Sequence, residues 1–241
     1  MEEKRLLSLV RQAVDEYEMI EEGDRIAVGI SGGKDSITLL FALNSLRKFY
    51  PKKFEIEAVT VDVGADMDFS PVKTLCDELS VRYTVINTEI KRIVFDEVKE
   101  KNPCSLCAKM RKGAFNNEAK KLNCNKVAYA HHKDDFVNTA LLSLVYEGRF
   151  YGLEPTTYLD KTGITLIRPL MYVNESEVIG FMNKHDFPVI KNNCPADGYT
   201  KREYISNLSK QINRENNGAR DRMFTAWMRE YEIIRENMKI T

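Results

Sequence analysis

The chain has 241 residues, of which 43% are apolar and 30% are charged. This composition excludes an intrinsically disordered chain, because apolar burial can offset the entropy of ordering. The 36 basic and 36 acidic side chains cancel, which by itself argues against a nucleic-acid partner. We expect no membrane span, because no apolar run reaches the necessary length of about 18 residues.

The charges are unevenly placed along the chain. Residues 1–100 hold 14 basic and 20 acidic side chains, whereas residues 101–241 hold 22 basic and 16 acidic ones. Chance and solvated helix faces are one explanation of this split. The other is a basic surface in the second part of the chain that faces an anionic partner.

Apolar periodicity predicts helices that alternate with short strands. Helices are expected over residues 3–20, 37–49, 71–79, 108–122, 134–146, 175–185 and, with a turn near 216–218, 201–238. Strands are expected over residues 25–30, 54–63, 82–88, 126–130 and 165–168. The alternation is typical of an α/β fold, in which an open parallel sheet has helices on both faces. We expect a main domain over residues 1–200 and a small helical C-terminal segment over residues 201–241.

A glycine-rich loop, Ser31-Gly-Gly-Lys-Asp-Ser36, joins the first expected strand to the next helix. Glycines let the backbone approach a phosphate closely, and the helix start offers free N–H groups and a positive dipole end. A Walker P-loop has four residues between its first glycine and the Gly-Lys pair, and a Ser or Thr directly after the lysine. Here three residues separate Gly29 from Gly33, and Asp35 follows Lys34, so the Walker pattern fails twice.

The loop resembles the Ser-Gly-Gly-x-Asp-Ser signature of the PP-loop ATP pyrophosphatases, a superfamily with a HUP-type, Rossmann-like fold. The resemblance implies that ATP is cut at its α-phosphate, that pyrophosphate leaves into the loop and that AMP passes to an acceptor oxygen. It assigns ATP binding to the six loop residues: Ser31, Gly32, Gly33, Lys34, Asp35 and Ser36. We expect Mg²⁺ to assist, with Asp35 as a ligand or an orienting carboxylate.

The end of the second expected strand, at Asp62 and Val63, is a further candidate part of the nucleotide site. In open α/β sheets, ligands bind at the carboxyl ends of the strands. We therefore expect Asp62 and Val63 to contact the ribose and the adenine, although Asp62 is equally well explained as a turn residue.

An odd number of cysteines, five, and an N-terminus without the apolar stretch of a signal peptide favour a reducing cytoplasm over a disulfide framework. Cys104 and Cys107 form a Cys-x-x-Cys pair, and Cys194 lies in a loop-forming sequence. Three loop cysteines can hold three corners of an iron–sulfur cluster. Alternatively, one cysteine can accept sulfur as a persulfide that another resolves. Cys76 and Cys124 are expected to be structural.

The whole chain resembles the tRNA 2-thiocytidine synthetase (TtcA) family. The matching features occur in order: the Ser31–Ser36 loop, Cys104 and Cys107, Ala130-His-His-Lys-Asp-Asp135, Ile167-Arg-Pro-Leu170 and Cys194. One departure is that well-known members place the third cysteine in a second Cys-x-x-Cys, whereas Cys194 stands alone. The cysteine-rich zinc fingers of related 2-thiouridine synthetases are absent from this sequence.

The resemblance implies ATP-dependent thiolation of a tRNA base, with C2 of an anticodon-loop cytidine as the expected target. It also implies a 4Fe-4S cluster with three cysteine ligands, Cys104, Cys107 and Cys194. The base oxygen would be adenylated, and sulfur would then replace it as AMP departs. The expected partners are tRNA, a sulfur donor (a cysteine desulfurase or free sulfide) and a second copy of the chain in a homodimer.

The segment after the fourth expected strand supplies more candidates. The resemblance favours His131 near the nucleotide and Asp134 or Asp135 near ATP or the reacting base. Either aspartate can also cap the next helix. A metal held by His131 and His132 together is not expected, because adjacent side chains on an extended backbone point to opposite faces.

Basic residues follow both cysteine regions. Arg111 lies one helical turn after Cys107, where it would face the cluster or a developing negative charge on the base. The residues expected to contact RNA are Lys109, Lys112, Lys201 and Arg202. Solvated helix faces remain the alternative explanation of these charges. The residues expected to act in catalysis are Asp35, Asp135, Arg111, Cys104, Cys107 and Cys194.

Four alternative functions remain open at this point. They are thiolation of another base such as uridine, RNA ligation like that of lysidine synthetases, sulfur transfer to a small molecule, and a non-catalytic redox or metal-sensing module. The three cysteines separate thiolation from lysidine chemistry, which needs none. ATP turnover to AMP separates an enzyme from a sensing module.

Overall fold

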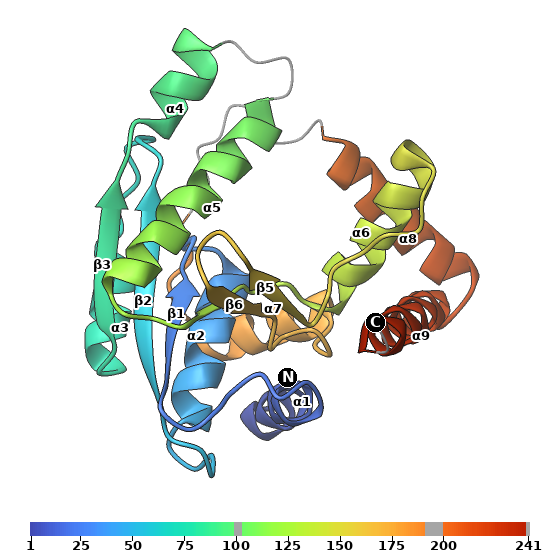
Figure 1. Ribbon diagram of the computed structural model, residues 1–241, viewed down its shortest axis with the longest axis horizontal. Helices are drawn as coiled ribbons and strands as arrows, with labels where there is room; N and C mark the ends of the chain where they lie inside the picture. Colours follow the sequence, from blue (N-terminus) through green and yellow to red (C-terminus); the bar gives the residue numbers. More distant parts are fainter. Residues whose placement is uncertain (99–102, 191–199, 240–241) are drawn as a thin grey trace.

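The computed structural model of the chain describes residues 1–98, 103–190 and 200–239, with side chains up to residue 236. Strands and helices alternate, as the periodicity predicts (Figure 1). The strands are β1 (Asp24–Gly29), β2 (Phe54–Asp62), β3 (Arg82–Asn87), β4 (Lys126–Ala128), β5 (Thr156–Leu159) and β6 (Ile164–Ile167). The helices are α1 (Glu3–Glu16), α2 (Lys34–Leu46), α3 (Ser70–Glu78), α4 (Ile90–Arg92), the π-helical η1 (Ile93–Glu97), α5 (Pro103–Lys121), α6 (Lys133–Glu147), α7 (Glu175–His185), α8 (Lys201–Glu215) and α9 (Ala219–Lys239).

The six strands form one sheet in the order β3-β2-β1-β4-β6-β5. All neighbouring pairs are parallel except β5 and β6, which are antiparallel. The expectation of an open parallel α/β sheet is therefore confirmed for five strands, while β5 adds an antiparallel edge. The chain leaves β1 toward β2 on one side and returns to β4 on the other, so the strand order reverses at β1.

Successive side chains of β1 face two different apolar layers, as the period of a strand requires. Ile26 and Val28 pack into the larger cluster, which also holds the apolar faces of α1, α2, α3 and α7. Ala27 faces a smaller cluster, in which α5 contributes Phe115 and Ala119. Helices thus cover both faces of the sheet, as expected.

The C-terminal helices α8 and α9 pack against α6 (Figure 1). Phe224, Trp227 and Met228 of α9 are buried in the larger cluster. These side chains therefore attach α9 to the core of the main domain. The boundary at residue 200 stays a prediction, since residues of α9 share a core with the main domain.

Three elements differ from the expected ones. The segment α4–η1 and strand β5 were not predicted, and α5 begins at Pro103 rather than at residue 108. The last difference moves Cys104 and Cys107 from a loop into the first two turns of a helix. Among the described residues, no helix is long and apolar enough to cross a bilayer.

Candidate active site

The carboxyl ends of β1 and β4 meet where the strand order reverses. In open α/β sheets this is the place where ligands bind. The glycine-rich loop follows β1, and residues 131–135 follow β4. Two segments that lie a hundred residues apart in the chain thus meet at this edge of the sheet, where His132 approaches Asp35, and we call this region the crevice.

The loop is closed by hydrogen bonds between its two serines. The Ser36 hydroxyl donates to the Gly33 carbonyl at 2.9 Å and accepts from the Ser31 N–H at 3.2 Å. The Ser31 hydroxyl donates to Ser36 Oγ, also at 3.2 Å. Gly32 adopts a φ of +80°, a left-handed conformation that glycine adopts without strain.

Helix α2 begins directly at this loop. Gly33 is its N-cap and has no side chain to bond the N–H groups of the first turn. These N–H groups have no partner within the helix, and they lie at the positive end of its dipole. The loop and the helix start together therefore form an anion-binding site of the kind that holds phosphates.

Lys34, at the first position of α2, sits between two carboxylates. Its Nζ lies 2.9 Å from Asp35 Oδ2 and 3.3 Å from Glu175 Oε1. Burial would lower the pKa of Lys34, but the two carboxylates outweigh it and raise that pKa above its usual value. The ammonium is thus kept charged at the mouth of the phosphate loop.

Glu175 also forms an ion pair with a second cation, which belongs to the C-terminal segment. Its Oε2 lies 3.2 Å from Lys210 Nζ of α8. Burial would raise the pKa of Glu175, but the hydrogen bond from Lys210 and the charge of Lys34 hold it below its usual value. A single carboxylate therefore joins the phosphate loop to α8.

His132, the N-cap of α6, faces the phosphate loop from the β4 side. Its Nε2 lies 3.7 Å from Asp35 Oδ1, and its Nδ1 lies 3.5 Å from Oδ2 of both Asp134 and Asp135. The ring is buried, and Nδ1 has no hydrogen-bond partner among the described residues. His132 thus lies among the three aspartates of the crevice.

The two aspartates of α6 have different surroundings. Asp134 is buried; it accepts the Glu175 N–H at 2.6 Å and pairs with Arg220 of α9. Asp135 accepts the His132 N–H at 3.0 Å through Oδ2. Burial raises the pKa of Asp135, and the charge of His132 only partly opposes that effect. Asp134 therefore holds helices together, whereas Asp135 faces the crevice beside His132.

His131 points the other way, as adjacent residues on an extended backbone should. Its Nδ1 accepts a hydrogen bond from Arg168 Nε at 3.2 Å, and its ring meets the Tyr129 ring edge-on. Burial, followed by the charges of Arg168 and Arg202, lowers the pKa of His131 to about 3. His131 is therefore neutral at physiological pH.

Asp62 and Val63 lie half-buried at the carboxyl end of β2. Asp62 Oδ1 accepts the Gly64 N–H at 2.9 Å, so its carboxylate closes a turn. The Val63 carbonyl accepts the Lys91 N–H at 2.9 Å. Contacts of these residues with ribose and adenine stay a prediction.

Cys104 and Cys107 share the first turns of α5. Residues three apart lie on one face of a helix, so one metal centre can take both thiols. Cys104 is exposed, and Cys107 is half-buried. No group of three His, Cys, Asp or Glu ligands gathers within the described residues, so a cluster here needs a further ligand.

Cys194, the predicted third ligand, lies outside the described residues. Ile190, the last described residue before Cys194, lies at the phosphate loop, where its N–H donates to the Gly32 carbonyl at 2.9 Å. Cys76 and Cys124 are buried, and burial raises their pKa values to about 12 and about 11. Both belong to apolar clusters, which confirms their structural role.

The predicted basic residues are exposed on two helices. Lys109, Arg111 and Lys112 lie on α5, and Lys201 and Arg202 lie at the start of α8. Charges on both helices act electrostatically at the end of β4, because the charges of Arg202 and Lys112 help to lower the pKa of His131. Lys201 Nζ lies 4.6 Å from the centre of the Tyr146 ring.

The sequence patterns missed several residues of this crevice. His132 was set aside with the metal hypothesis, and Arg168 appeared only as part of a matching motif. Glu175 carried no local signal, and the ion pairs of Lys210 with Glu175 and of Arg220 with Asp134 could not be predicted, because they form only in the folded chain.

The comparisons with known proteins agree with this geometry. A family model described as a PP-loop domain matches residues 3–212. A tRNA-cytidine(32) 2-sulfurtransferase from Geobacter sulfurreducens is 38% identical over 88% of this chain and 84% of that relative. A protein of the same name from Pelobacter propionicus is 39% identical over 88% of this chain and 80% of that relative.

A similar fold occurs in a solved structure, the U34-tRNA thiolase NcsA from Methanococcus maripaludis with its 4Fe-4S cluster. The TM-score is 0.77 at 21% identity, over 95% of this chain and 78% of that one. At this identity, the likeness shows that the two proteins share the fold.

Proposed function

This chain belongs to the tRNA-cytidine(32) 2-sulfurtransferases of the PP-loop family, and from that membership we propose that it thiolates cytidine 32 of tRNA at the expense of ATP. The observation that carries the proposal is the crevice between β1 and β4. There Asp35 of the phosphate loop lies 3.7 Å from His132, which in turn lies 3.5 Å from Asp135. Such an arrangement suits nucleotidyl transfer to an acceptor held beside α6.

The phosphate loop binds the β- and γ-phosphates of ATP. Lys34, which pairs with Asp35, neutralises their charge, and Asp35 would be the carboxylate that holds Mg²⁺ when ATP binds. The carbonyl oxygen on C2 of the cytidine attacks the α-phosphorus, forming an O–P bond as the bond to pyrophosphate breaks. Oxygen is a poor leaving group on that carbon, whereas AMP is a good one.

Asp135 is the carboxylate that orients the base or the metal, because Asp134 is already engaged by Glu175 and Arg220. Its Oδ1 makes no hydrogen bond with the described residues, so it is available to a ligand. Arg111 on α5 approaches the end of β4 closely enough to influence Tyr129, where burial is the main cause that raises the pKa to about 12. There it stabilises negative charge on the activated base.

Cys104, Cys107 and Cys194 would hold a 4Fe-4S cluster. The first two are compatible with it, since they share a helix face and Cys104 is exposed. With three protein ligands, such a cluster would supply an iron to bind the sulfur that is transferred. Free sulfide supplies that sulfur directly, or a cysteine desulfurase supplies it as a persulfide that a two-electron reductant, such as a dithiol, converts to sulfide. The chain works in the cytoplasm, as a homodimer.

The proposal is tested by anaerobic purification, an iron count and assay of AMP formation with tRNA. The chain should be brown, with about four irons, and should form AMP only when tRNA is present. Cys104→Ala should remove the iron, whereas Cys124→Ala, which alters a buried thiol of the apolar cluster, should retain it. A colourless, iron-free protein that still thiolates tRNA would exclude the cluster, and AMP formation independent of tRNA would exclude the proposed acceptor.

A further inference from the structure

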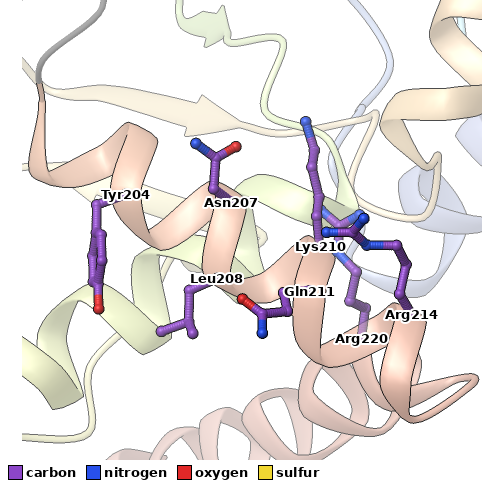
Figure 2. A pocket seen from close by; sticks show the side chains of 7 residues that line it. All are labelled: Tyr204, Asn207, Leu208, Lys210, Gln211, Arg214 and Arg220. Carbon is purple, nitrogen blue, oxygen red and sulfur yellow. The ribbon is translucent and has the colours of Figure 1, made fainter.

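Helix α8 bears a cleft of about 610 Å³ on its outer surface (Figure 2). Three cations, two amides, one tyrosine and one leucine line it, and no carboxylate does. The cations Lys210, Arg214 and Arg220 lie at one end in Figure 2, and Tyr204 lies at the other. We call this surface the α8 cleft.

The cations of the α8 cleft are not equally engaged. Lys210 pairs with Glu175, and Arg220 pairs with Asp134. Arg214 is exposed and makes no ion pair within the part of the chain that the structure describes. An uncompensated guanidinium beside two further cations is a favourable position for a phosphate.

The other end of the cleft is aromatic. Tyr204 is 58% exposed, although a large ring is more stable when it is covered. Asn207 and Gln211 lie between Tyr204 and the cations and can donate to or accept from base edges. From residue 204 to residue 214 the helix rises about 15 Å, enough for several phosphates of a strand.

The cleft is linked to the catalytic crevice through one side chain. Glu175 lies 3.2 Å from Lys210 and 3.3 Å from Lys34 of the phosphate loop. A ligand at the cationic end therefore lies next to the proposed ATP site. Lys201 and Arg202, at the start of the same helix, extend the positive charge beyond Tyr204.

We propose that the α8 cleft docks a single-stranded stretch of the RNA substrate, with phosphates on Arg214 and Lys210 and a base stacked on Tyr204. Cations at one end of the cleft, an aromatic ring at the other and amides between them match looped RNA, in which unstacked bases and the backbone are both exposed. This inference rests on the proposed function for the identity of the RNA, a tRNA.

The test is a titration with tRNA at several salt concentrations, in which binding is measured by fluorescence anisotropy. Arg214→Gln should weaken binding and lower the slope of log affinity against log salt by about 0.7, the share of one phosphate contact in a single strand. Tyr204→Ala should weaken binding by about fivefold or more without changing this slope, because stacking is not ionic. Tyr204→Phe should bind like the unaltered protein.

Lys48→Gln provides the matched control, since this exposed lysine follows the far end of α2. It should leave both affinity and slope unchanged. The inference is overturned if Arg214→Gln and Tyr204→Ala bind tRNA like the unaltered protein, or if Lys48→Gln weakens binding as much as they do.

Thiolation by the unaltered protein is measured in parallel, so that the two proposals can fail separately. Thiolation without any effect of the cleft variants overturns the docking surface and leaves the function standing. RNA binding that depends on the cleft, in a protein that never thiolates, overturns the function and leaves the docking surface standing.

Discussion

At the scale of single residues, the two glycines of the phosphate loop have different reasons to be glycine. Gly32 has a φ of +80°, and a Cβ there would lie 2.8 Å from the Ile190 side chain. Gly33 has a φ of −82°, and its Cβ would lie 3.4 Å from Ser31 Oγ. Only Gly32 is therefore required by both the backbone and the packing.

Gly32→Ala should lower the free energy of unfolding by about 1–2 kcal/mol from the backbone alone, and should weaken ATP binding. Gly33→Ala should change stability much less. Urea unfolding and calorimetric ATP titration measure the two effects. Equal losses from both substitutions would show that the left-handed conformation and the contact with Ile190 do not matter.

His131 makes stability depend on pH. Burial holds its pKa at about 3, below the ordinary value near 6.5, so the unfolded chain takes up this proton first. The neutral His131 side chain makes its full contribution to the free energy of unfolding above pH 6.5, and this contribution is lost as the pH falls from there toward 3. The slope approaches about 1.4 kcal/mol per pH unit.

His131→Gln should flatten this dependence, because an amide can still accept from Arg168 but does not titrate. Urea unfolding at several pH values between 7.5 and 5 measures it. If the unaltered chain and His131→Gln lose stability in parallel as the pH falls, another group is responsible.

At the scale of elements, Asp134 joins three helices. It lies on α6, accepts the first N–H of α7 and pairs with Arg220 of α9. Both partners of the ion pair are largely buried, so removing one leaves the other without compensation. Asp134→Ala should therefore cost about 3–5 kcal/mol of unfolding free energy.

Asp221→Asn is the control for this prediction, since its ion pair with Lys133 is a surface one in which Asp221 is 65% exposed. Its cost should stay below about 1 kcal/mol, because solvent screens the pair. Chemical denaturation with two probes measures both variants. A small effect of Asp134→Ala would show that α7 and α9 dock without this carboxylate.

Elements whose signals are local could be predicted from the sequence. The strand-to-helix transition at Ser31–Ser36 and the helix start at His132 follow from neighbouring residues. Strand β5 could not be predicted, because its four residues gain their hydrogen bonds from β6. The early start of α5 was missed because Cys104 and Cys107 were assigned to a loop, although Pro103 before them suits the first turn of a helix.

At the scale of the whole molecule, the residues that complete the crevice come from distant parts of the chain. Lys34, Glu175 and Lys210 belong to three different helices. Glu175 and Lys210 look like ordinary charged helix residues in the sequence, and only the fold brings them to Lys34 of the phosphate loop. The phosphate loop could be predicted from the sequence, whereas this ion-pair network could not.

The net charge must also be interpreted at the scale of the whole molecule. A neutral sum at first argued against RNA, but the excess of basic residues lies beyond residue 100. The structure places part of that excess in the α8 cleft, where no carboxylate lines the surface. An average over the chain therefore conceals a local cationic surface.

The sole tryptophan reports how α9 docks on the rest of the molecule. Trp227 is 3% exposed, donates to the Leu153 carbonyl at 2.7 Å and lies where a Cβ on Gly152 would approach its ring to 2.6 Å. Gly152→Ala should therefore displace the ring, shift its fluorescence to the red and lower the free energy of unfolding by about 1–3 kcal/mol.

Gly113→Ala is the matched control, because a Cβ there meets nothing within 4 Å. It should leave the fluorescence unchanged and should not destabilise α5. Emission spectra and urea unfolding measure both variants. An unchanged spectrum in Gly152→Ala would contradict the close packing of α9 against this loop.

The most direct test of the central claim is mass spectrometry of the nucleosides in tRNA after incubation with the anaerobic protein, ATP, Mg²⁺ and sulfide. The account predicts 2-thiocytidine at position 32, and none with Cys104→Ala or without ATP. The central claim would be contradicted if an iron-loaded protein that converts ATP to AMP left the tRNA without any thiolated cytidine.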